Sequence, residues 1–511
     1  MGSNPISDEI LYIYNLFGFL LLYADIYICI CILILLGFSV ILNESILKHK
    51  YKFHIFKWVN LFSCFSLVYA LFVLWESMYY EGILLNYQLI CDNLGFFVKF
   101  LLIILTLICL MASLSYFKYE ELKSFEYPLL VLLALLGILT IISSFDLITM
   151  YLAIELQSLC FYIITCLKVF SNFSVESGLK YFILGAFSSG MLLFGSSLLY
   201  GFSGTTNFLD FLILFDDIWF FNFYLYFGNL IGFVFILCGI FFKIGVVPFH
   251  LWVPDIYEGA PTVVSLFFAT VPQLSILVLL FRLNLVFAQF NNELFIFFLV
   301  LGGLSILIGT LGAINQSKLK RLLAFSAISN VGYSISVLCF VHYENYFSSF
   351  FFSMIYILST LSLWLCLLIF RNRSNFFKFK DIFELFLLFK SNNKYAIIFS
   401  LILFSAIGIP PMLGFFGKFY VFLNIFKLKL YFFSILLIIF SSLGVYYYLR
   451  IFKTMYSYTT NKLIFLVDPK KFKSVVLLSV VFLNLFFFIY ISHPQIRLFF
   501  LIFDFFEFFS F

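Results

Sequence analysis

Five charged side chains within long apolar stretches of this 511-residue chain are candidates for chemistry inside a membrane: Lys99, Glu155, Lys180, Lys243 and Lys418. Ionisable groups inside membrane spans are rare, usually face the protein interior and mark ion or proton paths. Burial disfavours the charged form of an unpaired ammonium, whereas a nearby carboxylate favours it. A buried carboxylate and several buried lysines are therefore groups that could pass protons across a membrane.

Four of these residues, and His250 beside the first helix break, also have a less specific interpretation. Glu155 can be a neutral carboxylic acid that bonds a hydroxyl. Lys418 can extend along apolar surface and place its ammonium at the membrane interface. Lys99 and Lys180 can do the same, or form ion pairs at the membrane boundary. His250 is either a proton relay or a hydrogen-bonded loop residue.

The composition determines the class of protein. Hydrophobic residues make up 64% of the chain and charged residues 11%, against roughly 45–50% and about 25% in soluble domains. These values exclude an ordinary soluble enzyme, a disordered protein and a nucleic-acid-binding domain, and the net charge of +5 forms no basic patch. The 79 phenylalanines are typical of an AT-rich coding sequence and point to an organelle genome.

The ten cysteines lie in or beside apolar runs, with no C-x-x-C pair and no histidine at metal-ligand spacing. Buried free cysteines behave as small apolar side chains. The sequence therefore favours neither an iron–sulfur cluster, nor another metal site, nor a disulfide framework. No G-x-G-x-x-G motif follows a strand-like run, so nucleotide binding has no support either.

Helical spans dominate the chain, because about 20 apolar residues cross a bilayer. We expect an all-α polytopic membrane protein with fourteen spans: 10–42, 55–75, 89–117, 128–145, 146–167, 179–202, 223–249, 259–287, 294–314, 320–341, 347–370, 395–426, 430–452 and 474–491. The tail 496–511 is apolar but shorter, and we expect it at the interface or against a neighbour.

The loops between these spans differ in charge. Lys and Arg gather in loops 1, 3, 9, 11 and 13, whereas loops 2, 4, 6 and 10 have none and loop 6 is acidic. Cationic loops remain on the side of synthesis, so the odd loops should face the matrix or cytoplasm and both termini the other side. Loop 12, with Lys427 and Lys429, is the exception.

Two spans contain helix breakers. I-G-x-x-P runs start at Ile244 and Ile407, 163 residues and five spans apart, and place Pro248 in the seventh span and Pro410 and Pro411 in the twelfth. Proline interrupts helices, and interrupted helices at corresponding positions of two halves indicate an inverted-repeat transporter and its ion path. Since five is odd, a five-helix repeat inverts its second copy.

With these residues in view, the chain resembles the antiporter-like membrane subunits of the proton-pumping NADH:ubiquinone oxidoreductase (mitochondrial respiratory complex I), and among them the subunit 2 type. Five blocks carry the resemblance: YLAIELQSL at 151–159, ESGLKYFILG at 176–185, PFHLWVPD at 248–255, KRLLAFS at 320–326, and GIPP running on to GFFGKFY at 408–420. The E-L-Q-S-L context favours subunit 2 over subunits 4 and 5.

The resemblance implies fourteen helices with two inverted five-helix repeats and broken helices 7 and 12. The implied divisions are 1–127 for helices 1–3, 128–287 for the first repeat, 288–457 for the second, and 458–511 for helix 14 and the tail. The family's helix-five glutamate falls on Glu155, and its lysines of helices six, seven and twelve fall on Lys180, Lys243 and Lys418, where they line a polar axis at mid-membrane.

Two positions depart from the family pattern. Gln273 stands where the family usually has a helix-eight lysine, and Asn330 where it has a histidine in the tenth span. Neither side chain titrates at physiological pH. Either water bridges these positions, or this chain conducts less well than its relatives and serves partly as scaffold.

The implied function is a core membrane-arm subunit of complex I. It would translocate protons while NADH oxidation and ubiquinone reduction, with their FMN and iron–sulfur clusters, proceed in other subunits, so that this chain itself holds no cofactor. Charge from a neighbouring subunit would displace a Lys180–Glu155 pair, act on Lys243 and move a proton toward Lys418.

The implied partners are core subunits of the 4 and 4L types, accessory subunits and lipids, without nucleic acid. The implied location is the mitochondrial inner membrane, with loops 1, 3, 9, 11 and 13 in the matrix. The alternatives are a stand-alone cation/proton antiporter of the same ancestry and a mainly structural membrane subunit.

Overall fold

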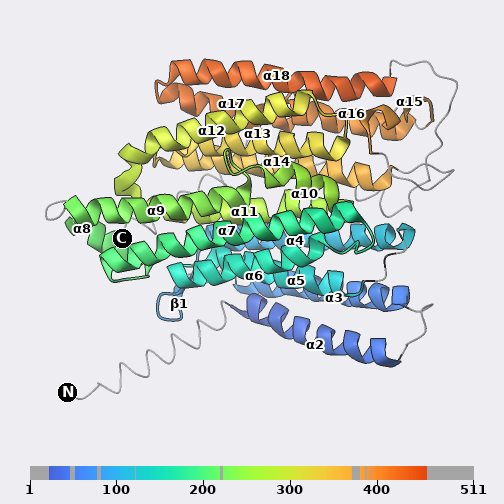
Figure 1. Ribbon diagram of the computed structural model, residues 1–511, viewed down its shortest axis with the longest axis horizontal. Helices are drawn as coiled ribbons and strands as arrows, with labels where there is room; N and C mark the ends of the chain where they lie inside the picture. Colours follow the sequence, from blue (N-terminus) through green and yellow to red (C-terminus); the bar gives the residue numbers. More distant parts are fainter. Residues whose placement is uncertain are drawn as a thin grey trace.

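The structure is a computed structural model that describes residues 22–45, 52–77, 82–120, 122, 124–218, 223–370, 380–385, 388–391 and 393–456. The described chain is a bundle of roughly parallel helices, with α2 at one end of the stack and α18 at the other (Figure 1). Eleven of the described helices are long and apolar enough to cross a membrane. The expected all-α polytopic membrane fold is therefore confirmed.

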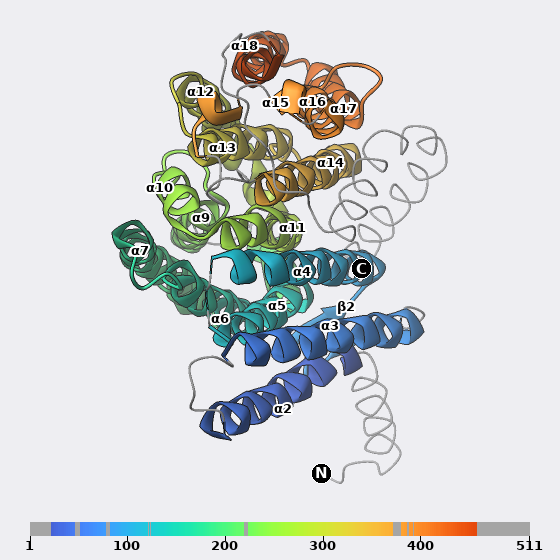
Figure 2. The same ribbon diagram turned by 90° about the vertical axis from the view of Figure 1, so that its right-hand side faces the viewer.

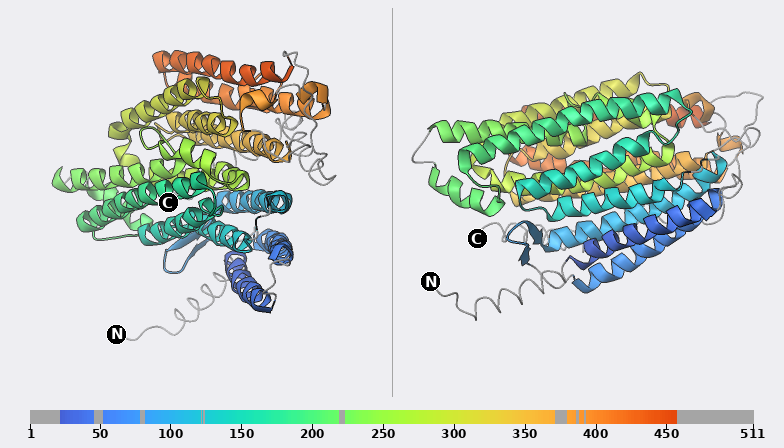
Figure 3. Two further views of the ribbon diagram at one scale, coloured as in Figure 1. Left: turned by 45° about the vertical axis from the view of Figure 1, so that its right-hand side comes forward. Right: turned by 60° about the horizontal axis from the view of Figure 1, so that its bottom comes forward.

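The N-terminal part contributes α2 (Tyr23–Ser45), α3 (Lys52–Ser77) and α4 (Asn93–Tyr119). Between α3 and α4 lies a short antiparallel hairpin of β1 (Gly82–Leu84) and β2 (Leu89–Cys91), in which Ile83 faces Ile90. The sequence did not predict this hairpin, and the span expected at 89–117 starts inside β2. Figure 3 shows the hairpin at one end of the bundle.

The next part runs through α5 (Glu126–Ser143), α6 (Leu147–Thr165), α7 (Asn172–Ser203) and the short α8 (Phe208–Ile218), which was not expected. A broken helix follows, made of α9 (Phe223–Ile244) and α10 (Trp252–Gly259), and then α11 (Thr262–Val286). Gly245 ends α9 with φ +86°, a backbone conformation that glycine adopts without steric cost. The predicted break before Pro248 is confirmed.

The last described part repeats this order of elements. It comprises η2 (Ala288–Phe290), α12 (Asn291–Ile314), α13 (Leu319–Val337), α14 (Tyr343–Ile369), η3 (Ile382–Leu385), α15 (Leu388–Ser391), α16 (Asn393–Ile407), α17 (Leu413–Lys427) and α18 (Tyr431–Tyr456). The pair α16 and α17 forms the second broken helix, and Gly408 ends α16 with φ +90°. The predicted break at Pro410 and Pro411 is confirmed.

Thirteen of the fourteen expected spans thus have a helical counterpart, if each broken helix counts as one span. The fourteenth, 474–491, the tail 496–511 and residues 10–21 of the first span lie outside the described residues. The sixth span begins seven residues earlier than expected, because the Ser171 hydroxyl accepts a hydrogen bond from Ser174 N and caps the helix.

Burial separates the central helices from the peripheral ones. The most apolar windows of α11 and α14 are 94% and 89% buried, whereas those of α2, α7 and α18 are 28%, 33% and 28% buried. Viewed along the bundle, α7 lies at one outer edge and α11 near the middle (Figure 2). The outer helices expose phenylalanine, leucine and isoleucine, which is the surface that a lipid environment favours.

Candidate proton path

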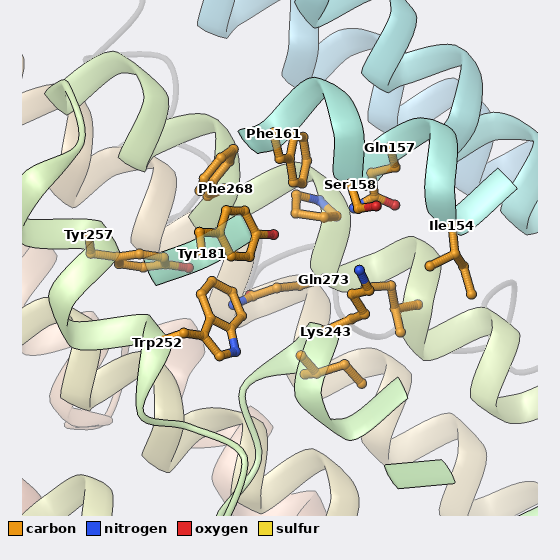
Figure 4. A pocket seen from close by; sticks show the side chains of 13 residues that line it. Ile154, Gln157, Ser158, Phe161, Tyr181, Lys243, Trp252, Tyr257, Phe268 and Gln273 are labelled. Atoms are coloured by element: carbon orange, nitrogen blue, oxygen red, sulfur yellow. The ribbon is translucent and has the colours of Figure 1, made fainter. Parts of the chain in front are cut away.

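The first broken helix opens onto a small cavity in the interior of the bundle. Lys243, in the last turn of α9, lines it together with Ser158 and Gln157 of α6, Tyr257 of α10 and Gln273 of α11. The cavity has a volume of about 20 Å³, enough for about one water molecule. Figure 4 shows the Lys243 ammonium pointing toward Ser158 and Gln157.

Lys243 is buried, and one carboxylate supplies the counter-charge for its ammonium. Its Nζ atom is buried and has no hydrogen-bond partner among the described residues. The carboxylate whose charge acts on it is Glu155, and the Tyr162 ring centre lies 5.9 Å from Nζ. An ammonium held this way depends on a single counter-charge, because no hydrogen bond compensates for its loss of hydration.

Glu155 lies on α6, one turn from the cavity residue Ser158. The Ser158 hydroxyl donates a hydrogen bond of 3.0 Å to Glu155 Oε2. This is the hydroxyl contact that the neutral-acid interpretation requires, and a carboxylate would accept the same bond. The contact fits either protonation state of Glu155, the carboxyl group whose charge acts on Lys243.

The second broken helix has a cavity of the same size. Lys418, in α17, lines a space of about 20 Å³ with Asn330 of α13, Tyr356 of α14, Ser405 of α16 and Tyr448 of α18. Gly414 makes this arrangement possible, since an added Cβ would stand 1.8 Å from the Ser405 carbonyl oxygen. The two halves of the chain thus each place one lysine beside a helix break.

The partners of Lys418 are backbone carbonyl groups. Its Nζ atom donates to Ile407 O at 2.7 Å and to Ala406 O at 3.5 Å. These carbonyls belong to the end of α16, where the helix dipole and unpaired oxygens favour a cation. The side chain therefore turns into the break, a direction that differs from the alternative interpretation in which it extends to the membrane interface.

The two uncharged positions lie at the two cavities. Gln273 lines the first cavity, and its side chain lies beside the hydroxyl of Tyr356, which lines the second. The Gln273 Oε1 and Tyr356 hydroxyl oxygens are both buried without a well-formed hydrogen bond among the described residues. Asn330 donates to Ser326 O at 2.9 Å within α13. Sequence reasoning missed Tyr356, which no charge marks.

Lys180 has partners that differ from the expected one. Its Nζ atom lies 2.8 Å from Glu176 Oε1 and 3.2 Å from Asp255 Oδ2. The expected pairing with Glu155 is wrong for this structure, since the ammonium bonds to α10 and its own helix. Lys180 does not line the cavity, but its neighbour Tyr181 does.

Lys99 belongs to a separate buried cluster in the N-terminal part. It pairs with Asp25 at 2.6 Å, and Arg282 of α11 pairs with Asp92 at 2.6 Å. All four side chains are at most 8% exposed. Asp25 and Arg282 were not among the predicted residues, although both are charges within apolar stretches and carry the same signal.

His250 lies in the turn between the two parts of the first broken helix. Its Nδ1 atom is buried and has no hydrogen-bond partner within the described ranges. It does not line the Lys243 cavity. The position beside Pro248 is as predicted, and a relay role for His250 stays a prediction.

Comparisons with known proteins agree with this architecture. Residues 144–444 match the family described as NADH:quinone oxidoreductase/Mrp antiporter, TM. NADH-ubiquinone oxidoreductase chain 2 of Marchantia polymorpha is 39% identical over 481 residues, which cover 93% of this chain and 96% of that protein. NADH-quinone oxidoreductase subunit N of Pelagibacter ubique (strain HTCC1062) is 38% identical over 402 residues, or 77% of this chain and 83% of that one.

A solved structure shares the fold. A chain of the structure titled respiratory complex I from Thermus thermophilus with bound Aureothin superposes with a TM-score of 0.73 at 24% identity, covering 91% of this chain and 98% of that chain. The matched family region spans both broken helices, the whole first cavity, and the second cavity except for Tyr448. The chain belongs to the NADH:quinone oxidoreductase/Mrp antiporter transmembrane family and, within it, to the group of chain 2 and subunit N.

Proposed function

We propose that this chain is the subunit 2 component of the membrane arm of respiratory complex I, and that it translocates protons coupled to NADH oxidation in other subunits. The observation that supports this most is the pair of equal cavities, each with one lysine at a helix break. The relatives at 38–39% identity carry the names NADH-ubiquinone oxidoreductase chain 2 and NADH-quinone oxidoreductase subunit N.

The proposed path has one half-channel in each repeat, with bounds of 128–287 and 288–457, between an N-terminal part at 1–127 and a C-terminal part at 458–511. A proton reaches Lys243 while Glu155 is charged, passes the Gln273–Tyr356 contact through water, and arrives at Lys418. Moving one charge against 100 mV costs about 2.3 kcal/mol, and a change of two pKa units at a relay group corresponds to about 2.7 kcal/mol.

The proposed setting is the mitochondrial inner membrane, with loops 1, 3, 9, 11 and 13 in the matrix. Core subunits of the 4 and 4L types, accessory subunits and lipids would surround the chain. Flavin, iron–sulfur clusters and ubiquinone would be bound by other subunits, so this chain contributes proton transfer and no electron transfer.

Two variants of the assembled complex test the proposal. Lys243→Met and Glu155→Ala should lower coupled NADH oxidation and leave the flavin and cluster content unchanged. The proposal would be disproved if both assembled variants kept the unaltered turnover and the unaltered proton-to-electron ratio. That result would favour a structural role.

A second experiment addresses the antiporter alternative. The purified chain alone, placed in liposomes with an imposed Na⁺ or K⁺ gradient, should not exchange either cation for protons. Sustained exchange by the isolated chain would show a stand-alone antiporter.

A further inference from the structure

The short helix α10 lies between the two halves of the bundle and carries two acidic residues. It packs against α7 on one side and α13 on the other. Asp255 and Glu258 lie one turn apart on it. Basic residues of both neighbouring helices reach this pair, so the charges of α10 connect elements that are far apart in the chain.

Asp255 is shared between the two neighbouring helices. Its Oδ2 atom lies 3.2 Å from Lys180 Nζ of α7, and its Oδ1 atom lies 3.5 Å from Arg321 Nη2 of α13. Lys180 has Glu176 as a second partner at 2.8 Å. Asp255 is therefore the one carboxylate on α10 that contacts basic groups of both halves among the described residues.

Glu258 differs from Asp255 in this respect. It pairs with Arg321 at 3.6 Å and with Lys318, both near the start of α13, and has no ion pair with α7 in the described chain. Lys320 Nζ adds a hydrogen bond of 2.6 Å to Ala260 O at the end of α10. The α13 side of α10 thus has several cationic contacts, and the α7 side has Lys180.

These ion pairs lie at the surface of the chain and are partly exposed. The Lys180, Asp255 and Arg321 side chains are 45%, 36% and 38% exposed. Asp255 lies at similar distances, 3.2 and 3.5 Å, from its two basic partners. A carboxylate shared in this way moves toward one partner when the other loses its charge.

Trp252, the first residue of α10, connects the Lys180–Asp255 ion pair to Lys243. The Trp252 indole N–H donates a 2.7 Å hydrogen bond to Phe242 O, next to Lys243. The same ring stacks on Tyr181, next to Lys180, with ring centres 5.0 Å apart and planes 17° apart. A shift of α10 therefore acts on the positions of both lysines.

We propose that Asp255 is a positioning residue that couples Lys180 to Lys243 and to the second half of the chain. When Lys180 is charged, Asp255 holds α10 against α7. When Lys180 loses its charge, Arg321 is the remaining ion-pair partner of Asp255, and α10 shifts toward α13. The hydrogen bond from Trp252 to Phe242 transmits this shift to the end of α9. This inference rests on the proposed function, because a shift of α10 affects turnover only if protons pass through Lys243.

The test uses the assembled complex with Asp255→Asn, which keeps the shape of the side chain and removes its charge. Coupled NADH oxidation and the proton-to-electron ratio should fall, with the rate about threefold lower, equivalent to about 0.65 kcal/mol. Asp255→Glu should restore most of the rate, and Glu258→Gln, which leaves the contact with α7, should stay near the unaltered complex.

A double variant separates positioning from packing. Lys180→Met with Asp255→Asn should be no slower than Lys180→Met alone, because Asp255 acts through Lys180. Additive losses, or failure of Asp255→Glu to restore the rate, would overturn the inference. If Asp255→Asn fails to assemble, Arg321→Gln tests the other partner and should lower the rate in the same direction; an unaltered rate would count against it.

Two variants distinguish a wrong role for Asp255 from a wrong proposed function. If Asp255→Asn has no effect while Lys243→Met lowers the rate, the inference about α10 is wrong and the proposed function stands. If Lys243→Met has no effect either, the proposed function itself is wrong.

Discussion

The two lysines at the helix breaks have opposite kinds of surroundings. Lys243 has no hydrogen-bond partner among the described residues and one carboxylate, Glu155, whose charge acts on it. Lys418 donates to two carbonyl oxygens at the end of α16. A carboxylate gains and loses charge, whereas a backbone carbonyl does not. The first site is therefore switchable, and the second provides a constant environment for a cation.

This difference suggests a division of roles between the two halves. Proton affinity at Lys243 follows the charge of Glu155, so input from outside the chain acts there first. Proton affinity at Lys418 is set by the fold of the break. The following predictions test this division in the assembled complex.

Lys243→Met should have the largest effect, lowering coupled NADH oxidation about tenfold, equivalent to about 1.4 kcal/mol. The substitution removes the titrating group and leaves the Glu155 charge without its cation. Rates are measured with NADH and ubiquinone, and oxidation of NADH by an artificial electron acceptor is the control. A loss smaller than that of Lys418→Met would reverse the proposed order of the two sites.

Lys418→Met should lower the coupled rate about threefold, equivalent to about 0.65 kcal/mol. The two carbonyl groups at the end of α16 remain and can still bind water in the cavity. The measurement is the same rate together with the proton-to-electron ratio. Complete loss of pumping with normal assembly would show that the carbonyls cannot replace the ammonium.

Tyr356→Phe should have a smaller effect, about twofold on the coupled rate, equivalent to about 0.4 kcal/mol. The hydroxyl lies between Gln273 and the second cavity, and its removal should slow transfer between the two lysines. Gln273→Lys in the same chain should relieve the defect by placing a titrating group there. Equal rates with and without the hydroxyl would show that the connection runs elsewhere.

The last prediction concerns stability instead of rate, at the glycines of the two breaks. Both have φ near +90°, so alanine costs about 1–2 kcal/mol at either position. Gly245→Ala should be the more harmful, since its Cβ would stand 2.5 Å from Val253 Cγ2, whereas the nearest atom at Gly408 is 3.3 Å away. The temperature of inactivation of each assembled variant measures this, and the opposite ranking would contradict it.

Much of the fold could be predicted because its signals are local. Apolar stretches predicted the thirteen spans that have a described helical counterpart, and the I-G-x-x-P runs predicted both helix breaks. The hairpin of β1 and β2 and the helix α8 were missed, because a search for stretches of about 20 apolar residues does not detect elements of three to eleven residues. The buried pairs of Asp25 and Arg282 were missed because no spacing along the chain links them to Lys99 and Asp92.

The site could be predicted only in part, for the same reason. Glu155, Lys243 and Lys418 were identified because a charge inside an apolar stretch is conspicuous. Tyr356 was not, because one tyrosine among 32 carries no such signal. Whether its hydroxyl lies beside Gln273 depends on how α11 and α14 are rotated against each other.

The sequence by itself determined the class of protein, the positions of the helix breaks and the charges that must be satisfied inside the membrane, since composition, proline and glycine act over a few residues. Only the tertiary structure decided which groups satisfy those charges. Lys180 bonds to Asp255, 75 residues away, and Lys418 bonds to the carbonyls of the preceding half-helix. Such pairings depend on helix rotation and ångström-scale distances, which come from the packing of the whole bundle.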